Sequence, residues 1–133
     1  MAVVKTSRKD QAAIQLKRGD LLAGQYLEYK LVVSGSQAVF ALVDDKKRVI
    51  MTNNDFPPAQ QEYKRKWPLN SAEIPAEADV THTLTLSFIS ATKYVYVVRH
   101  YDKGDNEVAL VKDIDYESDD ANDKTFNTLR IFL

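Results

Sequence analysis

Alternation of polar and apolar residues is the feature of this sequence that most limits its fold. Between positions 80 and 88, Thr or Ser stands at every second position, and His82, Leu84 and Leu86 stand between them. Successive side chains of a β-strand point to opposite faces, so a period of two residues is typical of a half-buried strand. This segment therefore predicts a strand with one face in a core and one face in solvent.

Segments with strand character recur along the chain, and turn residues separate most of them. The predicted strands span residues 12–16, 25–33, 38–43, 48–52, 80–89, 93–101, 107–115 and 125–133. No long segment repeats its apolar residues with the helical period. The sequence predicts an all-β fold, a single antiparallel β-sandwich of about eight strands, of which a jelly roll is one form, with one long proline-containing loop.

A chain of 133 residues has the length of one domain. Residues 1–11 are mostly polar and charged, and we expect a flexible N-terminal arm, or at most a short edge strand at 2–4. Residues 12–133 form the expected sandwich domain. Its core should contain apolar side chains of the predicted strands: Leu27 or its neighbours on 25–33, and Leu84, Leu86, Phe88, Val95, Val97 and Ile131.

Composition excludes several functional classes. The chain has no cysteine, which excludes disulfides, thiolate metal sites and cysteine nucleophiles. Lys and Arg number 18 against 19 Asp and Glu, so no net positive field favours nucleic acid as a partner. The N-terminus lacks the apolar run of a signal peptide, and no apolar stretch approaches the ~20 residues of a spanning helix. We expect a cytoplasmic protein without a membrane span, or one exported by a signal-peptide-independent route.

Residues 53–79 contain every proline of the chain, so they cannot form a central strand. We expect a long loop there, with at most one or two helical turns within 57–67. The loop carries the first candidate binding site: Tyr63, Lys64, Arg65, Lys66 and Trp67. Cations between aromatic rings can bind an anionic or carbohydrate ligand. In the alternative interpretation, the two rings anchor the loop and the cations face water.

Acidic residues crowd the end of the predicted strand at 107–115 and the segment 116–124 that follows. The candidate metal ligands are Asp113, Asp115, Glu117, Asp119 and Asp120. Carboxylate oxygens are the ligands that Ca²⁺ prefers, and the spacing of the first three places them on one side of an extended strand. The alternative is a solvated turn whose charges prevent aggregation. His82 and His100 could hold a metal with one carboxylate if they met across paired strands, but the favoured interpretation is two ordinary sheet residues.

The sequence contains no nucleophile elbow and no glycine-rich phosphate loop. We therefore expect a non-enzymatic binding module that presents loops to a protein or a carbohydrate, with no cofactor other than Ca²⁺. One alternative is a Ca²⁺-dependent binding protein or hydrolase that uses the acidic segment 113–123. Another is a self-assembling subunit, a homo-oligomer that pairs through edge strands such as 129–133.

Overall fold

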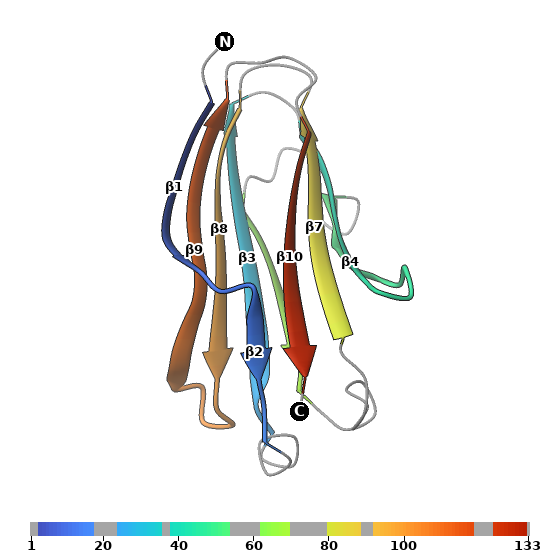
Figure 1. Cartoon of the computed structure of the whole chain (residues 1–133), viewed down its shortest axis with the longest axis vertical. Coiled ribbons are helices and arrows are strands. Elements are labelled where there is room, and N and C mark those ends of the chain that lie inside the picture. The colour runs from blue at the N-terminus through green and yellow to red at the C-terminus, as the bar shows by residue number, and fades with distance from the viewer. Residues whose placement is uncertain are drawn as a thin grey trace.

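The computed structural model describes residues 3–17, 24–35, 38–53, 62–69, 80–88, 92–118 and 124–132. These residues form two five-stranded sheets that pack face to face (Figure 1). The ten strands are β1 (Val3–Asp10), β2 (Ala13–Gln15), β3 (Tyr26–Gly35), β4 (Ala38–Asp44), β5 (Val49–Thr52), β6 (Glu62–Pro68), β7 (Val80–Phe88), β8 (Thr92–Tyr101), β9 (Glu107–Ser118) and β10 (Lys124–Phe132). The predicted β-sandwich is confirmed, with ten strands in place of eight.

The first sheet has the strand order β1-β9-β8-β3-β6, and the second has the order β2-β10-β7-β4-β5. Neighbouring strands run antiparallel, except that β2 pairs with β10 in parallel. Strands β1 and β2 follow each other in the chain but lie in different sheets, so residues 11–12 carry the chain from one layer to the other (Figure 1). The described ranges contain no helix that could span a membrane.

Strand β1 lies where the sequence predicted a flexible arm. It pairs with β9 from Val3 opposite Ser118 to Asp10 opposite Lys112, with one irregularity after Ser7. A polar segment can form an edge strand when its charged side chains find partners on the neighbouring strand. Arg8 does so on β9, which is a long-range contact that a local pattern does not reveal.

Strand β6 replaces part of the predicted loop at 53–79. It pairs with β3 from Glu62 opposite Val32 to Pro68 opposite Tyr26, so the helical turns expected within 57–67 are wrong for residues 62–67. It is an edge strand, which agrees with the exclusion of a central strand. The other prolines of this segment lie outside the described residues.

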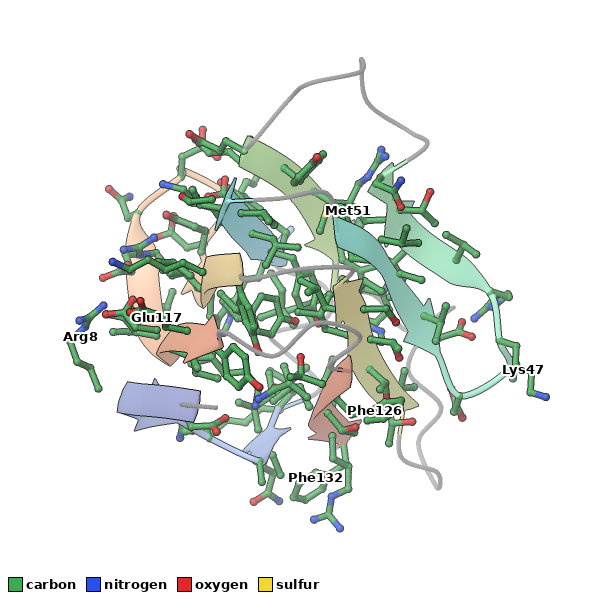
Figure 2. All side chains as sticks on the ribbon, turned by 90° about the horizontal axis from the view of Figure 1, so that it is seen from above. Arg8, Lys47, Met51, Glu117, Phe126 and Phe132 are labelled. Carbon is green, nitrogen blue, oxygen red and sulfur yellow. The ribbon has the colours of Figure 1, made fainter. Side chains whose placement is uncertain are left out.

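The core lies between the sheets and confirms most of the predicted residues, including Leu27, Leu84, Leu86 and Ile131. Val95 is only half-buried, because it lies on the outer face of β8. The alternate residues Tyr94, Tyr96 and Val98 point into the core between the sheets. Val97 is buried but does not belong to the cluster between the sheets. The side chain of Phe88 lies outside the described residues. Figure 2 shows side chains filling the space between the sheets, with Arg8 on the outer surface of the first sheet and Lys47 pointing away from the protein.

Candidate binding site on the edge strand β6

Two aromatic side chains hold β6 against the core. The Tyr63 ring packs edge-on against Phe40, with 4.7 Å between the ring centroids. The Trp67 ring lies perpendicular to the His82 ring, with 4.3 Å between their centroids. Both Tyr63 and Trp67 are half-buried and contact the core cluster. The interpretation of these rings as anchors therefore fits the structure, although they anchor a strand.

The three cations between the anchors are all exposed. We call Lys64, Arg65 and Lys66 the cationic edge. The Lys64 ammonium lies 3.3 Å from the Glu62 carboxylate, and the ammonium of Lys30 on β3 lies 3.8 Å from the same carboxylate. Two ammonium groups thus share one acid, so positive charge exceeds negative charge on this part of the sheet.

A small aromatic cluster supports the Lys66 end of the cationic edge. The Lys66 ammonium lies 4.9 Å from the centre of the Tyr26 ring, at cation–π distance. Tyr26 stacks on Tyr101, with 5.2 Å between the ring centroids. The Tyr26 hydroxyl donates a hydrogen bond of 2.7 Å to Asp105, which raises the pKa of Tyr26 to about 12. The ring beneath Lys66 is therefore fixed from two sides.

The backbone of β6 follows the alternation of an antiparallel ladder. Leu69 N–H donates to the Gln25 carbonyl oxygen over 3.0 Å, so this is a hydrogen-bonded pair. Hydrogen-bonded and non-hydrogen-bonded pairs alternate along the ladder. Lys66 and Lys64 precede Leu69 by odd numbers of residues, so their N–H and C=O groups point away from β3. Within the described ranges, no strand pairs with this outer side of β6.

Pro68 also belongs to a non-hydrogen-bonded pair, one position before Leu69. A proline there removes no hydrogen bond to β3, because its nitrogen faces the outer side of the strand. For this reason β6 can pair with β3 along its whole length, up to Pro68 opposite Tyr26.

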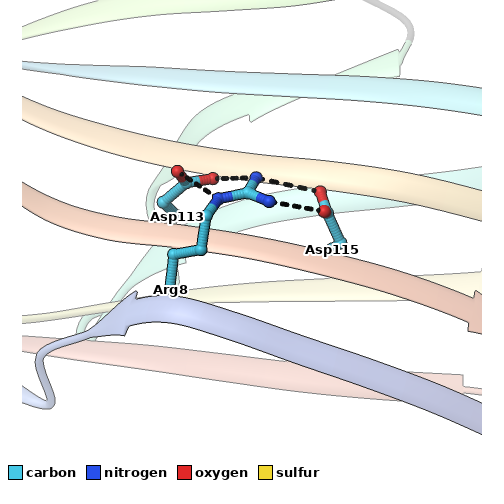
Figure 3. A network of polar contacts seen from close by, with 3 residues as sticks. All are labelled: Arg8, Asp113 and Asp115. Atoms are coloured by element: carbon cyan, nitrogen blue, oxygen red, sulfur yellow. Dashed lines mark hydrogen bonds and ion pairs between the residues drawn. The ribbon is translucent and has the colours of Figure 1, made fainter.

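The candidate metal ligands on β9 have an arginine between them. Asp113, Asp115 and Glu117 share one side of the strand, as their spacing predicted. Arg8 donates hydrogen bonds of 2.8 Å to both oxygens of Asp113 and one of 2.9 Å to Asp115 (Figure 3). The hydrogen bonds from Arg8 lower the pKa of Asp113. The guanidinium thus neutralises the two carboxylates that Ca²⁺ would need.

The remaining acidic candidates, Asp119 and Asp120, lie outside the described residues. Among the side chains that the structure describes, no three His, Asp or Glu groups are placed to hold a metal ion. Sequence reasoning missed Arg8, because it fell in the expected arm. Nothing near Arg8 in the sequence indicates its partners, because it is one cation in a short polar segment.

The two histidines lie in different sheets and do not meet. His100 on β8 bonds to the Gln25 side chain over 2.5 Å. His82 on β7 is fully buried, and its Nδ1 atom bonds to the Tyr29 hydroxyl. Its Nε2 atom has no hydrogen-bond partner among the described residues. Burial lowers the pKa of His82 to about 4, so the ring is neutral at pH 7.

An ion pair between a buried lysine and a partly exposed aspartate fastens the end of β1. The ammonium of Lys112, which is 1% exposed, lies 2.6 Å from the carboxylate of Asp10. Lys112 is on β9, and Asp10 is the last residue of β1 before the chain crosses to the second sheet. No local sequence pattern indicates this pair, because its partners are 102 positions apart.

Comparisons with protein families, curated proteins and solved structures found no match to this chain.

Proposed function

We propose that this chain is a non-enzymatic binding module that holds an anionic segment of a partner protein against the cationic edge. The observation that carries the proposal is the position of Lys64, Arg65 and Lys66. They are consecutive and exposed on an edge strand whose two flanking aromatic residues fix it to the core. A rigid scaffold that presents exposed charges is how many binding surfaces are built.

Charge favours an anionic partner. Glu62 is the only acidic residue on β6, and both Lys64 and Lys30 share it. Single ion pairs at an exposed surface contribute about 0–1 kcal/mol each and weaken with salt. Binding through this edge should therefore need several contacts at once and should fall as the salt concentration rises.

A protein fits the site better than a carbohydrate does. Sugars stack on exposed aromatic faces, but the rings of Tyr63 and Trp67 pack against Phe40 and His82. The groups that remain on the outer side of β6 are cationic side chains and backbone groups that no other described strand pairs with. A polypeptide with acidic side chains can satisfy both.

The alternative functions have less support. A hydrolase that used His82 would need this ring to meet its substrate, and the ring is fully buried. The self-assembly hypothesis rested on residues 129–133 as an edge, but β10 lies between β2 and β7.

Binding to a fluorescent oligoglutamate peptide, followed by anisotropy at low and high salt, tests the proposal. We expect the triple variant Lys64→Ala, Arg65→Ala, Lys66→Ala to bind at least about tenfold more weakly and to lose most of the salt dependence. A matched variant replaces three exposed lysines elsewhere, Lys9, Lys46 and Lys103, with Ala and so removes the same charge. It should bind within about twofold of the wild type. Equal losses in both triple variants would contradict a specific site on β6.

A further inference from the structure

We propose that the partner segment adds to the first sheet as a strand beside β6, and that it carries acidic residues at alternate positions. This inference rests on the proposed function and specifies how the partner is recognised. Its basis is the coincidence of two features on the same residues. Lys64 and Lys66 are cations, and they are also residues whose backbone groups point to the open side of the ladder.

The ladder fixes where the partner's backbone would lie. A strand beside β6 would form its hydrogen bonds with the outward N–H and C=O groups of Lys64 and Lys66. Because Lys64 and Lys66 are two positions apart, the two residues of the added strand that lie opposite them would also be two positions apart. Strand addition therefore requires only an extended segment of the partner, in which alternate residues lie opposite the two lysines.

The side chains fix the chemistry at these positions. Lys64 and Lys66 lie on the outer face of the first sheet, because they are opposite the outward-facing residues Lys30 and Glu28 of β3. In a sheet, directly opposite residues point to the same face, so the partner's side chains at these two positions would lie beside the two ammonium groups. Acidic side chains satisfy that arrangement. The partner motif is therefore acid–any–acid in an extended segment.

The same arrangement disfavours a second copy of β6 as the partner. In the register that centres two antiparallel β6 strands on Arg65, Lys64 of one copy would lie directly opposite Lys66 of the other. Like charges in that position are destabilising, and edge lysines are a common protection against self-pairing. In this central register an acidic strand is therefore a more favourable partner than a second copy of β6. Pro68 limits the contact further, because it offers no N–H to an added strand.

Two peptides of equal composition test the backbone pairing. Each has seven residues, with two Asp and five Thr or Val, but the two acids are two positions apart in the first, alternating peptide and adjacent in the second. We expect the alternating peptide to bind the wild-type protein about tenfold more tightly, since only it can place acids opposite both lysines. Amide hydrogen exchange of Lys64 and Lys66 should slow when it binds.

Two substitutions at one position separate charge from backbone. Lys64→Ala removes the cation alone, whereas Lys64→Pro removes the cation and the outward N–H. The proline should not disturb the ladder to β3, because Pro68 occupies an equivalent position already. We expect Lys64→Pro to bind the alternating peptide about three- to tenfold more weakly than Lys64→Ala, from the loss of one backbone hydrogen bond. Circular dichroism spectra of the two variants should agree.

Reversing the charge of Lys64 and Lys66 should create binding to a peptide of opposite charge. The variant Lys64→Glu, Lys66→Glu should lose the alternating acidic peptide and bind a peptide with lysines at the same alternate positions. If both acidic peptides bind equally, and Lys64→Pro equals Lys64→Ala, strand addition is wrong while a cationic binding site stands. If neither acidic peptide binds the wild type at low salt, the proposed function itself is wrong.

Discussion

His82 should make the stability of the protein depend on pH. The ring is fully buried between the sheets, where Tyr29 bonds to Nδ1 and the Trp67 ring packs against it. Burial is the largest cause that lowers its pKa. Two nearby carboxylates, Asp44 and Asp45, act in the opposite direction but do not cancel it.

The size of the effect follows from the two pKa values. The pKa of His82 falls from 6.5 to about 4 on folding, and each pH unit between them corresponds to about 1.4 kcal/mol. The unfolded chain takes up a proton first as the pH falls, so it gains relative to the folded state. The free energy of unfolding should therefore be constant above pH 7, fall by about 3 kcal/mol between pH 6.5 and 4, and lose nothing more from this group at lower pH.

Urea unfolding followed by circular dichroism at several pH values measures this loss. Carboxylates also titrate near pH 4, so the comparison needs a variant without the histidine. The double variant His82→Leu, Tyr29→Phe removes the titrating ring and leaves no unpaired hydroxyl. Its unfolding free energy should vary about 3 kcal/mol less than that of the wild type over the same pH range. Parallel curves for the two proteins would refute the buried, neutral state of His82.

Further predictions concern the core and two buried charges. Leu86→Ala should lower the free energy of unfolding by about 2–5 kcal/mol in urea titrations, and Val95→Ala clearly less, because only Leu86 is fully buried. Asp10→Ala should cost about 3 kcal/mol by removing the carboxylate that lies 2.6 Å from the buried Lys112 ammonium; a second change, Lys112→Met, should restore most of that stability, and no restoration would contradict the ion pair. Asp44→Ala should cost about 2 kcal/mol in thermal melts, because its carboxylate accepts hydrogen bonds from the backbone N–H groups of residues 46 and 48.

The fold class could be predicted because most strands carry their own pattern. Strand β7 alternates Thr with apolar residues, and each of the eight predicted strands is present with shifted ends. The alternation did not identify the inner face of β8, where both faces are apolar. Tyr94 and Tyr96 face the core, and Val95 does not. Only packing between the sheets decides that choice.

The two missed strands are both edges. Strands β1 and β6 are rich in charged residues and pair with a neighbour on one side, so neither shows a clear apolar face. Their structure depends on partners far along the chain, such as Asp113 for Arg8 and Tyr29 opposite Arg65. The candidate residues of the site could be named from the sequence. Their arrangement on an open edge could not, because it follows from the ladder with β3.

Amide hydrogen exchange of the protein alone tests the open edge of β6 most directly. We expect protection to alternate along the strand. The N–H groups of Tyr63, Arg65 and Trp67 point towards β3 and should exchange slowly, whereas those of Lys64 and Lys66 point outward and should exchange fast. Slow exchange at Lys64 and Lys66, equal to that at Arg65, would mean that the outer side of β6 is already paired and would contradict the binding edge.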